Sequence, residues 1–382
     1  MIPATLPIPG APVRIGDTLE EIETPALLVD LDHLETNIAR MAKLFQGTRA
    51  RLRPHAKAHK CPAIAHLQLA RGAVGFCCQT VSEAEVLVVE GIADVLVTNQ
   101  IVDPHKLDRL AALSRRAAVA VCVDHPEQVH QLEAACVRQD SRLGVLVEVD
   151  VGGGRCGVPP GSAAANLAER IAGSSRLHFA GLQAYNGKAQ HLRGIEERRA
   201  AAVNTAEHAS VAVAAVASRG LVCESVTGGG TGTFLFDLEA GLLTEIQAGS
   251  YALMDADYAR NQSEPRTTFT QALQVLATVI SRPAADRAVI DAGLKAIAFD
   301  SGPPEPLDLR EARCQRPSDE HCELVLGGAA QSLSIGQKLR LAPGHCDPTI
   351  NLHDWLVAVR GDRVEALWPI AARGYRWPGQ SS

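Results

Sequence analysis

The sequence lacks several features that would point to a membrane or to nucleic acid. Its longest apolar runs, such as 117–123, have the length of a β-strand and not of a membrane span. It has no excess of positive charge, since 43 acidic and 37 basic residues give a net charge of −6, which argues against nucleic acid or an anionic membrane as the main partner. Residues 1–4 lack the layout of a secretory signal.

The sequence also lacks a disulfide framework, internal repeats and low-complexity tracts. Its ten cysteines are irregularly spaced, with one adjacent pair, Cys77-Cys78, and no Cys-x-x-Cys, so reduced thiols are expected. At 382 residues and 46% hydrophobic content, the chain is long enough for two domains. Together these features predict a soluble, cytoplasmic globular protein.

Short runs rich in Val, Ile and Leu alternate with longer amphipathic stretches between about residues 25 and 250. The expected strands are 26–30, 51–55, 75–79, 94–98, 119–123, 144–149, 178–184, 224–227 and 244–247, and the expected helices include 34–45, 104–114, 126–137, 163–171 and 194–218. Strands that are apolar on both faces and alternate with helices indicate a parallel sheet covered by helices. Without the first strand, eight β/α units remain, which favours a TIM-like (β/α)8 barrel over the alternative of a doubly wound open sheet.

The pattern changes after about residue 265. Short β-like runs follow, separated by turn residues, at 272–280, 288–291, 323–325, 338–341, 355–360 and 363–369. Segments 301–306 and 316–320 have the composition of exposed loops. We therefore expect a barrel over 33–265 followed by a mainly antiparallel β domain over 266–382.

A lysine among histidines follows the first expected barrel strand, in the octapeptide Arg-Pro-His-Ala-Lys-Ala-His-Lys at 53–60. A lysine fixed at a strand end is what Schiff-base chemistry requires, with a pKa lowered by nearby positive charge. We expect His55, His59 and Lys60 to supply that charge to Lys57. The alternative is a basic loop that binds phosphate or faces water.

Polar residues recur where the other barrel strands end, which is the face where barrels carry their active sites. They are Gln79, Ser82, Asn99, Glu148, Asp150, Arg155, Gln183, Tyr185 and, a little further on, His191. Gly152, Gly154 and Gly157 match G-x-G-x-x-G, but this pattern lies deep in the chain and holds a charged residue within the turn. We therefore interpret these glycines as shaping a loop that points Arg155 into the site.

The seventh barrel strand ends in Thr-Gly-Gly-Gly-Thr-Gly-Thr at 227–233. Glycines let main-chain amides converge on an anion, and loops after the seventh and eighth strands are where barrels usually bind phosphate. Gly249, Ser250 and Tyr251 follow the eighth strand and complete the expected cradle. The alternative for 227–233 is a flexible turn.

A possible metal pair, His345 and Asp347, lies near the C-terminus within Pro-Gly-His-Cys-Asp-Pro-Thr at 343–349. In an extended segment residues i and i+2 project to the same side, so these two would share an ion while Cys346 points away. An imidazole and a carboxylate suit manganese, magnesium or zinc, bound exchangeably. A structural loop histidine is the alternative, and His353-Asp354 is a second candidate pair.

Taken together, these motifs resemble the metal-dependent D-threonine aldolase and 3-hydroxy-D-aspartate aldolase branch of the fold type III pyridoxal-phosphate enzymes, which have an alanine racemase-like barrel. The resemblance covers almost the whole chain. Its most specific pieces are 53–61, 147–158, 181–185, 227–232, 247–251, 343–349 and 351–354. It implies a homodimer and an N-terminal arm, 1–32, that joins the C-terminal domain.

The resemblance also implies residue roles. Lys57 would bind pyridoxal 5'-phosphate covalently, and Arg155 would face its ring nitrogen. The implied cofactor-binding set is Lys57, Gln79, Arg155, Tyr185, Thr227, Gly229, Gly230, Thr231, Gly249, Ser250 and Tyr251. His345 and Asp347 would hold a divalent metal that acidifies the β-hydroxyl of a D-3-hydroxy amino acid. His191 would remove the hydroxyl proton, and cleavage between Cα and Cβ would give glycine and an aldehyde.

Some alternatives stay open. Related D-serine dehydratases carry His-x-Cys at the metal position, so Asp347 favours aldol cleavage over β-elimination, although Cys346 would compete after a one-residue shift. Lys188 or Arg193 would recognise the second carboxylate of 3-hydroxyaspartate, or be solvated surface charges. A racemase or decarboxylase would need no metal pair. A catalytically silent cofactor carrier and a cofactor-free sugar-phosphate barrel enzyme are further alternatives.

Overall fold

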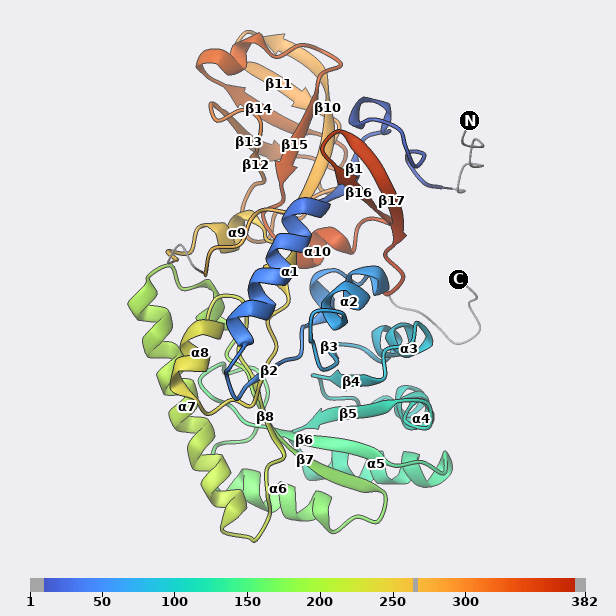
Figure 1. Ribbon diagram of the computed structural model, residues 1–382, viewed down its shortest axis with the longest axis vertical. Helices are drawn as coiled ribbons and strands as arrows, with labels where there is room; N and C mark the ends of the chain where they lie inside the picture. The colour runs from blue at the N-terminus through green and yellow to red at the C-terminus, as the bar shows by residue number, and fades with distance from the viewer. Residues whose placement is uncertain (1–9, 264–266, 375–382) are drawn as a thin grey trace.

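The computed structural model describes residues 10–263 and 267–374, and its larger part is a ring of parallel strands with helices outside it (Figure 1). The ring strands are β2 (Arg51–Leu52), β3 (Phe76–Cys78), β4 (Asp94–Val97), β5 (Ala118–Val123), β6 (Leu143–Glu148), β7 (Leu177–Ala184), β8 (Ser225–Gly228) and β9 (Glu245–Ile246). Each pairs in parallel with the next from β3 to β9, and β9 pairs with β2. Main-chain hydrogen bonds from Val74 to Leu52 and from Cys77 to Pro54 close the ring. The barrel prediction is confirmed, and the open-sheet alternative is wrong.

Helices cover the outside of the ring and connect its strands. They are α1 (Leu31–Phe45), α2 (Pro62–Leu69), α3 (Val81–Val89), α4 (Pro104–Leu113), α5 (Pro126–Arg138), α6 (Ser162–Ala172), α7 (Ile195–Ala217) and α8 (Phe234–Ala240). The helix expected from residue 34 begins at Leu31, because the Asp30 carboxylate accepts the His33 main-chain N–H at 3.0 Å and caps the first turn. Among the described residues no helix is long and apolar enough to cross a bilayer.

The second sheet lies at the other end of the molecule (Figure 1). It contains β1 (Ala26–Asp30), β10 (Leu273–Ala284), β11 (Arg287–Ile290), β12 (Glu305–Pro306), β13 (Ala312–Pro317), β14 (Cys322–Leu326), β15 (Lys338–Ala342), β16 (Trp355–Arg360) and β17 (Arg363–Pro369). β1 pairs antiparallel with β10 and parallel with β16, so a strand from the start of the chain lies inside the C-terminal sheet. The division into 1–32, 33–265 and 266–382 stays a prediction.

Two expected loops are partly strands. Glu305–Pro306 pairs with β15, and Arg316 and Pro317 end β13, which pairs with β14. Both segments have low intrinsic β propensity. The partner of Glu305–Pro306 lies more than 30 positions further along the chain, whereas Pro317 pairs with Cys322 across a short loop, so there the turn-like composition concealed the end of a hairpin strand.

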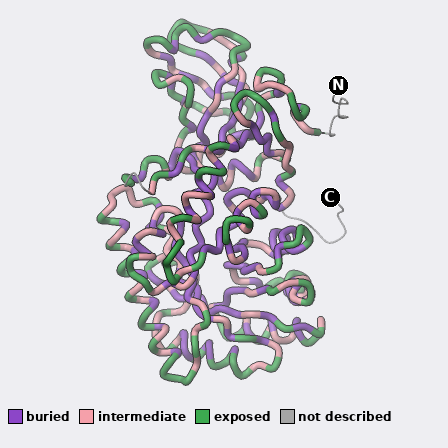
Figure 2. The backbone as a smooth tube through the Cα atoms, viewed as in Figure 1, coloured by how far each residue is buried: buried purple, intermediate pink, exposed green. Residues whose placement is uncertain are grey.

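Short helical segments bring the two sheets together beside the barrel mouth. Residues 56–58 form the 3-10 turn η2 (Ala56–Ala58), which packs against α10 (Cys346–Ile350). α9 (Ala256–Ala259) follows the last barrel strand. Buried segments run through both sheets and the helices between them (Figure 2), and one hydrophobic cluster includes residues of both sheets. The packing thus fixes the C-terminal segment against the barrel.

Candidate active site

A cavity of about 220 Å³ opens at the C-terminal ends of the barrel strands. Its lining residues are His55, Lys57, Ala58, Gln79, Thr98, Arg155, Gln183, Tyr185, Gly187, His191, Gly230, Thr231, Gln247, Gly249, Ser250 and Tyr258. They include most of the predicted cofactor-binding residues and His191. Thr227, Gly229 and Tyr251 are not among them.

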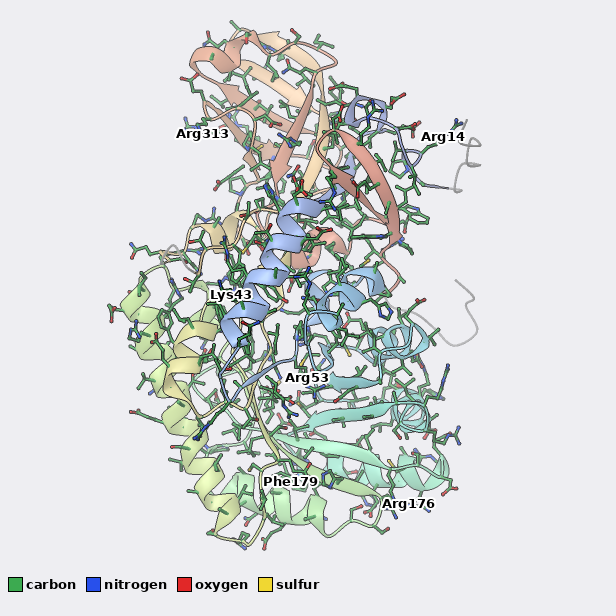
Figure 3. All side chains as sticks on the ribbon, in the orientation of Figure 1. Arg14, Lys43, Arg53, Arg176, Phe179 and Arg313 are labelled. Atoms are coloured by element: carbon green, nitrogen blue, oxygen red, sulfur yellow. The ribbon has the colours of Figure 1, made fainter. Side chains whose placement is uncertain are left out.

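A larger hollow of about 420 Å³ lies at the opposite end of the barrel, where the strands begin. Arg53, labelled in Figure 3, lies beside it and is nearly buried. Its guanidinium is 2.7 Å from Asp94 and 2.7 Å from Glu245, so its charge is already neutralised. Barrel active sites lie at the other face, and the polar groups converge there, so we assign the site to the smaller cavity.

Lys57 lies in η2 at the edge of the cavity, with its Nζ atom 2.8 Å from Oδ2 of Asp347. The Asp347 charge raises the pKa of Lys57 above its ordinary value. The expected lowering of this pKa by nearby cations is therefore wrong for this state of the site. The physical reason is the negative charge of Asp347, a residue 290 positions further along the chain. Its effect on the pKa of Lys57 is larger than that of the residues next to Lys57 in sequence.

The neighbours expected to supply positive charge to Lys57 do not do so. Burial lowers the pKa of His55 well below its usual range and that of His59 to about 4, so both rings are neutral at neutral pH. Lys60 forms an ion pair with Glu83 at 3.1 Å and also donates to Asn351 at 3.0 Å. His55 instead orders the cavity wall, since its Nε2 lies 3.1 Å from the Thr98 hydroxyl and 2.9 Å from the Gln79 amide.

His345 and Asp347 are brought together, although not in the extended geometry expected. His345 is the residue just before α10 and Asp347 lies within the first turn of that helix, which places Nε2 of His345 4.0 Å from Oδ2 of Asp347. Two ligand atoms at that separation can both reach one ion at about 2.1 Å. Burial alone would raise the pKa of Asp347, but Lys57 lowers it to about 2, so the carboxylate is ionised and able to bind a cation.

The surroundings of this pair fit a two-ligand site. Nδ1 of His345 lies 2.7 Å from Oδ2 of Asp300, which leaves Nε2 as the ring atom directed at an ion. Burial raises the pKa of the Cys346 thiol. The thiol was expected to point away from the metal pair, but it lies 3.4 Å from Oδ1 of Asp347. In the described ranges no group of three or more His, Cys, Asp or Glu residues is arranged to hold a metal.

The side chains of the second candidate metal pair, His353 and Asp354, contact other groups of the protein. Nε2 of His353 lies 2.8 Å from the carbonyl oxygen of Ala296, and Asp354 forms an ion pair with Arg373. Both side chains are thus committed to contacts inside the C-terminal part of the chain.

The wall formed by the glycine-rich loop and residues 249–250 fits a phosphate group. A Cβ atom at Gly230 would lie 2.5 Å from the Gln190 side chain, and one at Gly249 would lie 2.5 Å from the His55 carbonyl, so only glycine leaves this wall open. Thr231 and Ser250 add hydroxyls at the cavity. Thr227 instead accepts a hydrogen bond from Gln247 inside the barrel at 2.9 Å.

Tyr251 contributes to the wall through its main chain only. Its hydroxyl is buried and accepts a hydrogen bond from Gln68 at 2.9 Å. Its main-chain N–H donates to the Thr231 hydroxyl at 3.0 Å and so joins the two loops. Tyr251 therefore stabilises the two loops of the predicted phosphate site without facing the cavity itself.

Arg155 reaches the cavity from a loop that glycines and Asp150 shape together. Asp150 accepts the main-chain N–H groups of Gly152 and Gly154 at 3.0 Å each. A Cβ atom at Gly157 would lie 2.5 Å from the Asp150 nitrogen. The guanidinium of Arg155 lies 5.9 Å from the centroid of the Tyr185 ring. A cation and an aromatic face at one end of the cavity fit the ring of a pyridine-type cofactor.

His191 also lines the cavity, and its Nδ1 atom lies 2.5 Å from Oδ2 of Asp257 in α9. The same carboxylate binds Arg193, which also donates to Asn261 at 2.7 Å. Arg193 is therefore held by Asp257 and Asn261, and its recognition of a substrate carboxylate stays a prediction. Lys188 lies at an adjoining hollow of about 370 Å³, which Arg155 and Tyr185 also line.

Several residues that the fold brings to the site were not predicted from the sequence as site residues. They are Thr98, Gln247 and Tyr258 in the wall, and Asp257 and Asp300 behind the two histidines. The run Asp255-Ala256-Asp257-Tyr258, which follows the last strand after the turn at 250–252, is a polar signal of the kind used for the other strands. Asp300 lies in an irregular segment and carries no such signal.

Comparison with known proteins is consistent with this geometry. The family model "Alanine racemase, N-terminal domain" matches residues 29–257, and "Putative serine dehydratase domain" matches 272–359. A D-threonine aldolase from Arthrobacter sp. is 45% identical, over 97% of each chain. A 3-hydroxy-D-aspartate aldolase from Paracoccus denitrificans is 43% identical, over 96% of this chain and 95% of its own.

Solved structures agree with the sequence relatives. The crystal structure of a D-threonine aldolase from Filomicrobium marinum has a TM-score of 0.93 and 47% identity, and the match covers 95% of this chain and 98% of that one. A D-threo-3-hydroxyaspartate dehydratase from Delftia sp. HT23 has a TM-score of 0.84 at 28% identity, over 94% of this chain and 100% of its own. This chain therefore belongs to the family of D-threonine aldolases and 3-hydroxy-D-aspartate aldolases, which are aldehyde-lyases with the alanine racemase-like barrel.

Proposed function

We propose that this protein is a pyridoxal-phosphate- and divalent-metal-dependent aldolase that cleaves D-3-hydroxy amino acids to glycine and an aldehyde. The observation that carries the proposal is the 2.8 Å contact between Lys57 and Asp347. It brings the predicted metal pair next to the predicted cofactor lysine, at the edge of the cavity that Lys57 and His191 line. An amino-acid racemase of this fold would have no use for His345 and Asp347 in that place.

Different cavity residues would bind different parts of the cofactor. Gly230, Thr231, Gly249 and Ser250 would hold the phosphate, Lys57 the aldehyde carbon, and Arg155 would lie toward the ring nitrogen. When bound, pyridoxal phosphate supplies an electron sink for the electron pair that remains at Cα when the Cα–Cβ bond breaks. Because an arginine keeps its proton, Arg155 would leave the ring nitrogen unprotonated and the sink moderate.

His345 and Asp347 would hold the metal, with manganese or magnesium favoured and zinc possible. One imidazole and one carboxylate leave positions for water and substrate, and the Cys346 thiol that zinc would prefer is kept protonated by burial. When bound, such an ion lowers the pKa of the substrate hydroxyl. Nε2 of His191, the ring atom not engaged by Asp257, would then accept the hydroxyl proton.

The test is product analysis of the purified protein with pyridoxal phosphate, given D-threonine or D-3-hydroxyaspartate, in manganese or in EDTA. Acetaldehyde or glyoxylate, with glycine, formed only with metal would support the proposal and rank the substrates. Ammonia and a keto acid would instead indicate a dehydratase. The structural similarity to the Delftia dehydratase is the reason for testing this alternative. Turnover to neither product pair would refute both.

We further propose that the protein works as a homodimer in the cytoplasm. The support is the family resemblance and a set of ten cysteines that are all unpaired in the structure. Light scattering on the holoenzyme tests the assembly, and a monomer at micromolar concentration would contradict it.

A further inference from the structure

We propose that Asp257 is a positioning residue that holds the His191 ring with Nδ1 protonated and Nε2 directed to the cavity. The inference rests on the proposed function, because that function makes His191 the acceptor of the substrate proton. The proposal concerns a residue outside the cavity wall, which acts on the reaction only through His191.

The contact between the two side chains fixes one tautomer. Oδ2 of Asp257 lies 2.5 Å from Nδ1 of His191, and an ionised carboxylate only accepts hydrogen bonds. Nδ1 is therefore the donor, and in the neutral ring Nε2 carries the lone pair. Without such a partner a neutral imidazole exchanges between both tautomers.

Burial fixes the direction of the ring. The side chain of Asp257 is 5% exposed and that of His191 is 44% exposed, so the carboxylate lies beneath a ring whose other side is open. The Tyr258 ring, which also lines the cavity, is centred 5.5 Å from the His191 ring and limits its rotation. Because Asp257 takes the Nδ1 side of the ring and His191 lines the cavity, we infer that the Nε2 side faces the cavity.

Two arginines keep Asp257 ionised and in place. Arg193 and Arg260 both bind Oδ1, the oxygen that does not contact His191, with Arg260 at 3.2 Å. Arg193 also donates to the main-chain oxygen of Asp257 at 2.7 Å. Although burial raises the pKa of Asp257, the hydrogen bonds from Arg193 and His191 lower it below its ordinary value overall. The carboxylate is thus a fixed anion and not a proton store.

The same short helix also supports the predicted metal segment. The main-chain N–H of Asp257 donates to the Gly344 carbonyl at 3.2 Å, and that of Ala256 donates to Pro343 at 2.9 Å. α9 therefore sets His191 at a fixed place relative to His345. Substitution of the Asp257 side chain leaves these main-chain bonds available, so an effect on His191 can be separated from an effect on the metal pair.

The experiment compares wild type with Asp257→Asn and Asp257→Ala. An asparagine can turn either its oxygen or its NH₂ to the ring, so it keeps the shape and loses the tautomer preference. We expect kcat for aldol cleavage to fall roughly 10- to 100-fold, as for other outer partners of functional histidines, with KM changed by less than about twofold. Mn²⁺ affinity of both variants should equal that of wild type. Asp308→Asn, at an arginine-paired aspartate away from the cavity, is the matched control.

A spectroscopic measurement tests the same inference without cofactor or turnover. In protein labelled with ¹⁵N-histidine, the His191 signals, assigned by their loss in His191→Gln, should show the Nδ1–H tautomer in wild type and a mixture in Asp257→Asn. An unchanged tautomer or an unchanged kcat in folded Asp257→Asn overturns the proposal. Activity retained in His191→Gln would refute the catalytic role of His191, while a tautomer change in Asp257→Asn would still show that Asp257 orients the ring.

Discussion

The Nζ atom of Lys57 lies 2.8 Å from Oδ2 of Asp347, and that same oxygen lies 4.0 Å from Nε2 of His345. The lysine predicted to bind the cofactor and the histidine predicted to bind the metal therefore share one carboxylate oxygen. A metal cation and the Lys57 ammonium would compete for it, because two cations close to one oxygen repel each other.

The first prediction follows from this competition. In cofactor-free protein, Lys57→Ala should bind Mn²⁺ roughly three- to tenfold more tightly than wild type, which is the effect of removing a partly exposed ion-pair partner. Electron paramagnetic resonance of free Mn²⁺ measures the affinity. Lys60→Ala removes a lysine that pairs with Glu83 and should leave the affinity unchanged. Equal affinities in all three proteins would show that Lys57 does not occupy the metal position.

The second prediction concerns the covalent role of Lys57. Lys57→Ala should abolish the visible absorption band of the bound cofactor and the activity, because no other lysine lines the cavity among the described residues. Absorbance after reconstitution with pyridoxal phosphate is the measurement. An undiminished band in this variant would move the assignment to Lys60.

The third prediction concerns the carboxylate behind the metal histidine. Asp300→Asn should weaken Mn²⁺ binding roughly 10- to 100-fold, because Oδ2 of Asp300 fixes the ring of His345 through Nδ1 at 2.7 Å. Isothermal titration of Mn²⁺ measures the loss. Asp319→Asn, at an exposed aspartate beside Lys295, is the control and should bind like wild type. Wild-type affinity in Asp300→Asn would mean that the ring needs no such support.

The fourth prediction concerns the open wall of the cofactor cavity. Gly249→Ala should weaken pyridoxal phosphate binding roughly 10- to 100-fold, because the new Cβ would lie 2.5 Å from the main-chain oxygen of His55 and one wall must move. Gly173→Ala adds the same atom at an exposed helix end, where its nearest neighbour is 3.4 Å away, and should bind normally. Fluorescence titration of both variants decides whether the wall is as tight as the structure indicates.

The fifth prediction concerns Asp237, which is buried near the glycine-rich loop and accepts a hydrogen bond from Thr233 at 2.6 Å. Burial raises its pKa from 3.8 to about 7. At pH values between these two, Asp237 is protonated in the folded protein and ionised in the unfolded chain. The contribution of Asp237 to the free energy of unfolding therefore falls as pH rises from about 4 to about 7. Asp237→Asn removes that dependence.

Urea unfolding of cofactor-free wild type and Asp237→Asn at several pH values measures the difference. The variant should gain stability relative to wild type as pH increases through this window, because contributions from all other groups cancel in the comparison. A constant difference between the two proteins would show that Asp237 titrates alike in both states.

Local sequence was enough to predict the barrel and much of its polar face. Apolar runs of strand length between amphipathic stretches locate β4 to β8 within a few residues, since both signals depend only on neighbouring positions. Residues at strand ends, such as Gln79, Tyr185 and Thr231, lie at the cavity because parallel strands in a barrel all end on one face. The sequence thus determined the fold class and most of the cavity wall.

Only the tertiary structure decided which charges meet. The octapeptide around Lys57 predicts a lowered pKa, and Asp347 reverses that prediction from the other end of the chain. The loop position of Arg193 suggests a substrate contact, yet Asp257 binds it. Such pairs depend on how segments far apart in sequence pack, and electrostatic energies change steeply over a few ångströms. No local sequence pattern determines those distances. The reactive residues could therefore be predicted from the sequence, whereas their charged partners depend on the tertiary packing.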